Sequence, residues 1–141
     1  MKNDILIAEF MGWKIDNSFP DKDRVWRSPG NNIELGTTMK FSQSWDWLIP
    51  VIEKIESLDL SEWMYKWEGM DGETNYNFEG ISVEIENTRC WIYINLSLDP
   101  YWTINEKTFN IKHETKLKAV YEAVVEFIEW YNERKQREEG N

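Results

Sequence analysis

The chain has 141 residues and a net charge of −10, from 26 acidic residues against 16 lysines and arginines. This length fits one domain that buries its own apolar core, and a single cysteine, Cys90, excludes an intrachain disulfide. No run approaches the roughly 20 apolar residues of a membrane span, and acidic residues interrupt the N-terminal apolar run, which is atypical of a secretion signal. We therefore expect a cytoplasmic domain that needs no membrane.

The negative charge is concentrated in the middle of the chain. Residues 42–86 carry eleven acidic side chains against two lysines, whereas the acids and bases of residues 1–41 cancel. The simplest interpretation is a solvated acidic face. The alternative is a surface that docks on a basic protein or imitates nucleic acid. Either interpretation disfavours direct binding to a nucleic-acid backbone, which carries the same sign of charge.

The first half of the chain predicts a helix, two strands and a second helix. Apolar residues between Asn3 and Gly12 predict a short helix that ends at the glycine. An extended segment follows Trp13, and the turn Pro29–Asn32 separates strands expected over 24–28 and 33–41. The second helix follows the cap candidates of 42–44. Whether Pro50 starts or kinks that helix is left open by the sequence.

The centre predicts antiparallel strands. Aromatic residues alternate over 63–67, apolar residues alternate over 81–86, and Cys90 begins a third alternating run that ends near Leu96. The period of two places Trp91 and Tyr93 on the face opposite to Cys90. Residues 108–112 are a candidate for the last strand.

The last helix has the clearest periodicity. Apolar side chains recur three and four residues apart, at Leu117, Val120, Tyr121, Val124, Phe127, Ile128 and Tyr131. We therefore expect one α+β domain over residues 1–135 and a polar, frayed tail over 136–141. The expected order is α-β-β-α-β-β-β-α, with helices covering one antiparallel sheet of four to six strands.

The residues of most catalytic templates are missing. His113 is the only histidine, and the chain lacks a cysteine–histidine cluster, a phosphate-loop glycine pattern and a dinucleotide fingerprint. Carboxylates are abundant, but those of Asp71, Glu73, Glu84 and Glu86 fall in turns or on the outer face of a strand. The expectation is therefore a protein that is not an enzyme and uses no cofactor or metal. A small hydrolase with carboxylates and a metal is the weaker alternative.

The candidate binding residues are aromatic and basic. Nine tryptophans are more than a domain of this size buries easily. Exposed aromatic side chains mark a protein contact or a platform for stacking a base. Arginines flank a tryptophan on the predicted hairpin, an arrangement suited to a phosphorylated ligand. The site residues predicted on these grounds are Arg24, Trp26, Arg27, Trp91, Tyr93, Tyr101 and Trp102.

Three segments resemble a known family. The segments IAEFMGWK, SWDWLIPVIEKIE and KAVYEAVVEFIEWYN resemble small proteins encoded by bacteriophages and prophages, and their arrangement is similar to the phage ABA sandwich domain. The resemblance covers residues 4–15, 42–57 and 115–132, and it implies helices packed on an antiparallel sheet. It implies no catalytic residue.

By analogy with such phage proteins, we expect an accessory protein that binds and blocks a host factor in the host cytosol, as in counter-defence. Its contact surface would be acidic and aromatic, and its partner a host protein. The alternative is sequestration of a nucleotide immune signal in a pocket of tryptophan and arginine. A structural role in the virion and association with further copies of the chain both stay open.

Overall fold

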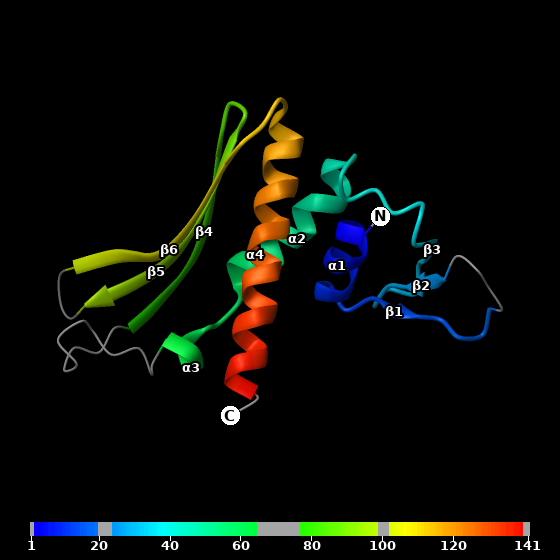
Figure 1. The fold of residues 1–141 in the computed structure, drawn as a ribbon, viewed down its shortest axis with the longest axis horizontal. Coiled ribbons are helices and arrows are strands. Elements are labelled where there is room, and N and C mark those ends of the chain that lie inside the picture. The colour runs from blue at the N-terminus through cyan, green and yellow to red at the C-terminus, as the bar shows by residue number, and fades with distance from the viewer. Residues whose placement is uncertain (1, 20–23, 65–76, 99–101, 140–141) are drawn as a thin grey trace.

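The computed structural model describes residues 2–19, 24–64, 77–98 and 102–139 (Figure 1). The elements in chain order are α1 (Lys2–Phe10), β1 (Lys14–Ile15), β2 (Val25–Arg27), β3 (Ile33–Leu35), α2 (Trp45–Ser57), α3 (Ser61–Met64), β4 (Asn77–Glu86), β5 (Arg89–Leu98), β6 (Trp102–Lys112) and α4 (Lys116–Glu139). The helices and the antiparallel strands occupy separate stretches of the chain, so the predicted α+β class is confirmed.

The strands form two sheets instead of one. Within the described residues, β1-β2-β3 and β4-β5-β6 are separate three-stranded antiparallel sheets. The prediction of a single sheet of four to six strands is therefore wrong. The reason is visible in Figure 1, where α1 and α4 lie between the two sheets, so that no edge of one can pair with the other.

The larger sheet and the helices form the main layers. One face of β4–β6 packs against α4 and α2, and α1 packs on α4 on the side away from that sheet (Figure 1). Four residues of β5 point into this interface and are fully buried: Cys90, Ile92, Ile94 and Leu96. The Phe127 ring of α4 meets the Phe109 ring of β6 edge to face, with centroids 5.7 Å apart. The predicted apolar stripe of α4 thus covers the sheet.

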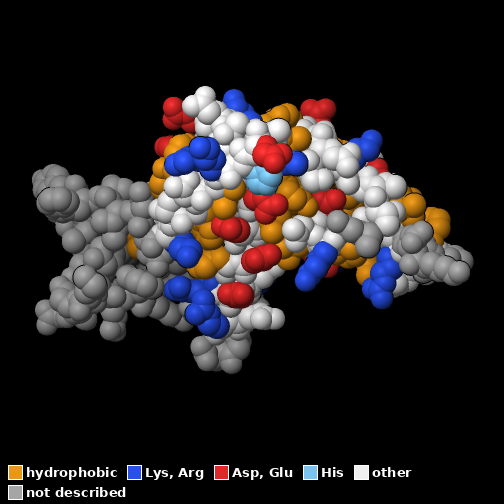
Figure 2. Space-filling model, turned by 45° about the horizontal axis from the view of Figure 1, so that its top comes forward, with side chains coloured by type: hydrophobic (Ala, Val, Ile, Leu, Met, Phe, Trp, Pro, Cys, Tyr) orange, Lys and Arg blue, Asp and Glu red, His pale blue; other side chains and the backbone are white. Residues whose placement is uncertain are grey.

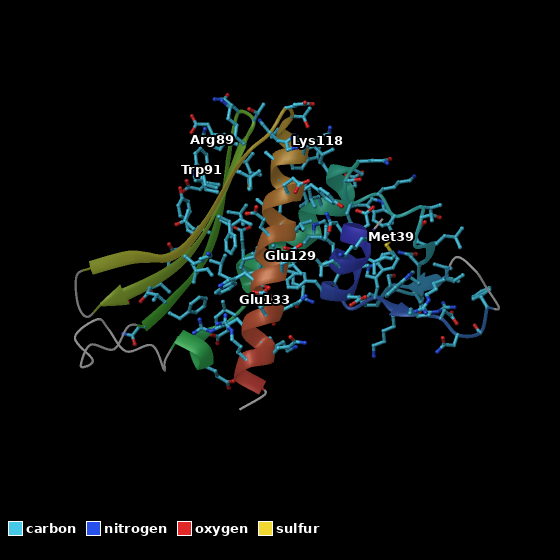
Figure 3. All side chains as sticks on the ribbon, in the orientation of Figure 1. Met39, Arg89, Trp91, Lys118, Glu129 and Glu133 are labelled. Carbon is cyan, nitrogen blue, oxygen red and sulfur yellow. The ribbon has the colours of Figure 1, made fainter. Side chains whose placement is uncertain are left out.

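The side of α4 that faces neither the larger sheet nor α1 is acidic and exposed. Glu126, Glu129 and Glu133 are exposed, and the last two are labelled on this side in Figure 3. Acidic side chains run down the middle of the molecular face in Figure 2. The helix continues past Lys135 to Glu139, into the segment expected to be a frayed tail.

Side chains and backbone explain where two of the helices stop and start. At the end of α1, the amides of Gly12 and Trp13 donate to the carbonyls of Glu9 and Ala8, at 3.0 and 2.9 Å. Gly12 has a φ of 87°, the left-handed conformation that this motif requires, as the sequence predicted. Thr115 caps α4, because its Oγ1 accepts the amide of Lys118 at 3.1 Å.

One local prediction needs correction, and one open alternative is resolved. Residues 61–64 form the short helix α3, so the strand expected from Trp63 does not begin there; residues 65–67 of that expectation lie outside the described part. The second helix, α2, begins after its N-cap Ser44, one of the cap candidates of 42–44, and Pro50 therefore lies inside the helix and does not start it. Pro50 is exposed, so α2 keeps its apolar side against the core.

Candidate binding face

The outer face of the larger sheet is the strongest candidate for a binding surface. The strand registers place three rows of side chains across it: Glu86, Arg89 and Lys112; Glu84, Trp91 and Asn110; and Ser82, Tyr93 and Thr108. We call these nine residues the Trp91 face. Among the described helices, α4 makes the main contact with β5, and α4 lies on the other side of the sheet (Figure 1). This face is therefore open within the described part of the chain.

Two aromatic side chains occupy the middle of the Trp91 face. Trp91 and Tyr93 are half-buried, and they point away from α4, as the alternation of β5 predicted. Figure 3 shows Arg89 and Trp91 together on the outer side of the sheet. The Arg89 guanidinium lies 5.7 Å from the centre of the Trp91 ring, within the range of a cation–π contact.

Polar contacts fix the side chains around this pair. The Tyr93 hydroxyl donates to the Glu84 carboxylate; desolvation, followed by that charge and that hydrogen bond, raises the pKa of Tyr93. Asn95 donates to Ser82 Oγ at 2.8 Å, one step further along the sheet. Because the backbone of all three strands is paired, the aromatic rings sit on a rigid support.

One end of the face is hollowed. A shallow cavity of about 370 Å³ lies where the β4–β5 turn meets the end of β6, and Glu86, Arg89, Trp91 and Lys112 line it. Asn87 makes the turn with a φ of 54°. Two cations and one indole ring thus converge beside a single carboxylate. This arrangement suits a group that carries both a negative charge and a flat ring.

The structure corrects the prediction of a binding site on the small hairpin. Trp26 is 5% exposed and belongs to the core, so its ring has no free face for a ligand, whereas Arg24 is exposed. Arg27 is half-buried and donates to Asp16 Oδ2 from Nε at 2.9 Å and from Nη2 at 2.6 Å. The hairpin uses its tryptophan and one arginine for folding.

The Asp16 carboxylate is held by more than Arg27. The hydroxyl and amide of Ser18 both donate to Asp16 Oδ1, at 2.5 and 3.0 Å. These bonds, followed by the one from Arg27, lower the pKa of Asp16 to about 2. This network ties the β1–β2 connection to β2.

The last two residues predicted at the site are Tyr101 and Trp102. Tyr101 and the side chain of Trp102 lie outside the described residues, so their predicted role stays a prediction. Arg89 and Lys112 were not predicted at the site. The period of two could have placed Arg89 beside Trp91, whereas Lys112 reaches this face only through the register of β6 against β5.

The two side chains considered as reactive in the sequence, those of Cys90 and His113, each have a defined place in the fold. Cys90 is fully buried, and burial raises the pKa of its thiol to about 12, which keeps it protonated. His113 lies in the turn before α4, where its Nδ1 accepts the amide of Glu114 at 2.9 Å. Among the described residues, no three histidine, cysteine or acidic side chains are grouped as metal ligands would be.

Comparison with known proteins gives no match, whether by family model, by curated protein or by solved structure. Among the described helices, none is long and apolar enough to cross a membrane.

Proposed function

We propose that this chain is a binding protein whose contact with a protein partner is centred on the Trp91 face. The observation that carries the proposal is an uncovered sheet face with Trp91, Tyr93 and Arg89 adjacent on one strand. Tryptophan, tyrosine and arginine are the residue types most enriched among the energetically dominant residues of protein interfaces. Partly exposed rings on a paired strand lose little conformational freedom when they are covered.

The net charge of the whole chain favours a basic partner, whereas the Trp91 face itself is balanced, with Glu84 and Glu86 against Arg89 and Lys112. Glu84 and Glu86 lie beside the aromatic pair on β4, and the chain as a whole carries −10. A net charge of this size accelerates encounter with a cationic surface and discourages nucleic acid. Following the resemblance to phage proteins, we propose that the partner is a host protein which this chain occupies and blocks, as a counter-defence protein does.

The experiment compares three immobilised proteins in extracts of a candidate bacterial host. These are the unaltered chain, the double variant Trp91→Ala/Tyr93→Ala, and the control Glu126→Gln/Glu129→Gln on the exposed side of α4. We expect a host protein that the unaltered chain and the control retain and the Trp91 variant loses, and then binding of that purified protein with the same order of affinities. Equal retention by all three folded proteins would contradict the proposal.

A second function is favoured by the hollow at the end of this face. Trp91, Arg89 and Lys112 form the tryptophan–arginine pocket that the sequence suggested at another place, and they suit sequestration of a nucleotide. The test is thermal shift of the chain with cyclic and ADP-ribose-type nucleotides, compared with Arg89→Gln/Lys112→Gln. A shift only in the unaltered chain, with the nucleotide recovered intact after denaturation, supports this function. The absence of any shift excludes these nucleotides as ligands.

A further inference from the structure

A second hollow lies on the other side of the molecule, between β3 and the first turns of α2. It encloses about 460 Å³, and its lining includes Trp13, Ile33, Glu34, Phe41, Asp46 and Trp47. We call it the Trp13–Trp47 hollow. None of these residues belongs to the Trp91 face, so the two surfaces can be altered separately.

Three aromatic rings form one wall of this hollow. The Trp13 and Trp47 rings are stacked, with centroids 5.8 Å apart and planes inclined by 30°. Phe41 stands at 86° to Trp47, at 5.0 Å, and is almost completely buried. The buried phenylalanine fixes the two indoles, which both stay partly exposed. Indole faces held in this way attract cations through the ring quadrupole.

The charges in the lining have one sign. Glu34 and Asp46 are the charged members among the described residues that line the hollow, and both are acidic. Glu34 Oε2 accepts the Thr38 hydroxyl at 2.7 Å, which orients the carboxylate and leaves its other oxygen for a further donor. Asp46 is exposed in the first turn of α2. Two carboxylates therefore accompany the indole rings.

The rim is apolar and exposed. Ile33 is 47% exposed, and Pro50, which also lines the hollow, is exposed as well. Large aliphatic side chains left in water next to a concave aromatic wall are typical of a surface that a partner covers. The rim would contact apolar residues that flank the group held in the hollow.

We propose that the Trp13–Trp47 hollow binds an arginine side chain presented by a protein partner. A planar guanidinium stacks on an indole and bonds a carboxylate with two donors at once, which matches the rings and the two acids here. A second copy of this chain is disfavoured as the occupant, because it also carries −10. This proposal uses a different surface from the proposed function and does not depend on it.

The first test uses N-acetyl-arginine amide as the probe. The indole N–H signals of Trp13 and Trp47 are assigned by Trp→Phe variants and followed by NMR during titration, with the citrulline analogue as the uncharged comparison. We expect saturable shifts of these two signals with the arginine probe and not with citrulline. Equal shifts with both probes, or shifts spread over all indole signals, would overturn the proposal.

The second test uses a labelled peptide with one arginine between leucines, measured by fluorescence anisotropy. We expect Glu34→Gln/Asp46→Asn to weaken binding by about tenfold, because the variant removes the carboxylates that form charge-assisted hydrogen bonds with the guanidinium. The matched control Glu126→Gln/Glu129→Gln removes the same charge elsewhere and should leave binding unchanged. Equal losses in the two variants would show only general charge attraction and would contradict the site. Dimers that dissociate on Ile33→Glu would instead assign the hollow to a second copy.

Discussion

The two sheets place the same pair of residue types in opposite environments. In the small sheet, Trp26 and Arg27 are used internally, the first in the core and the second in an ion pair with Asp16. In the large sheet, Trp91 and Arg89 contact each other on an open face. The strands of the small sheet have two or three residues, whereas those of the large sheet have ten or eleven. Neighbouring elements therefore decide whether such a pair is used inside the fold or stays on an open face.

The largest difference between the sheets should appear when each tryptophan is removed. We expect Trp26→Ala to lower the free energy of unfolding by about 3–5 kcal/mol, because it empties a core position, and Trp91→Ala to lower it by no more than about 1 kcal/mol. Urea unfolding followed by circular dichroism measures both.

Trp26→Phe sharpens this comparison. The buried Nε1 of Trp26 has no acceptor among the described residues, so the phenylalanine removes an unsatisfied donor while it keeps most of the ring. Its cost should be well below that of Trp26→Ala. Equal costs for Trp26→Ala and Trp91→Ala would contradict the contrast between the sheets.

The next largest difference in the free energy of unfolding is expected between substitutions on the two faces of β5. Ile92 is fully buried under α4, and Ile92→Ala should cost about 2–5 kcal/mol from lost burial and the cavity that remains. The next residue points the other way, and Tyr93→Ala should cost about 1 kcal/mol. Thermal unfolding of the two variants at one pH separates these values. A cost for Tyr93→Ala as large as that for Ile92→Ala would mean that this face is covered.

The contact between α1 and α4 contains a buried carboxyl group, that of Asp4. The Tyr121 hydroxyl donates to Asp4 Oδ1 at 3.1 Å, and burial raises the pKa of Asp4. Tyr121→Phe removes the donor and should lower the free energy of unfolding by about 1–3 kcal/mol at neutral pH.

The pH dependence of this contact has a definite sign. The folded state holds the Asp4 proton more tightly than the unfolded state, whose pKa is near 3.8. Stability is therefore greatest where the carboxyl is protonated in both states and falls as the pH rises through the raised pKa. Asp4→Asn should remove this decline while keeping an oxygen for Tyr121. An unchanged pH profile in Asp4→Asn would contradict the assignment.

The smallest expected effect concerns Asp16 in the small sheet. Its pKa of about 2 depends first on the Ser18 hydroxyl and amide and then on Arg27, so Ser18→Ala, which removes the hydroxyl bond, and Arg27→Ala should each raise it. The lowered pKa stabilises the folded state above the ordinary value of 3.8, and this contribution is lost as the pH falls toward 2. An NMR titration of the Asp16 carboxyl measures both variants. A pKa of Asp16 that is unchanged in Ser18→Ala would contradict the role of the hydroxyl bond.

The candidate site was only partly predictable. The alternation Cys90, Ile92, Ile94 placed Trp91 and Tyr93 on the outer face, and the structure agrees, because a strand has only two faces. The same reasoning failed for Trp26. An alternating strand shows which residues share a face, but it does not show which face another element covers. Lys112 and the Trp13–Trp47 hollow join residues far apart in the chain, and no local pattern connects them.

Local periodicity and backbone conformation were sufficient to predict several features of this chain. These are the α+β class, the stop of α1 at Gly12, the apolar stripe of α4 and the two-faced pattern of β5. Only the tertiary structure decided that the strands form two sheets, with α1 and α4 between them, and that Trp26 is buried while Trp91 stays open. The physical reason is that burial depends on contacts between distant segments, whereas periodicity reports only how one segment turns its own side chains.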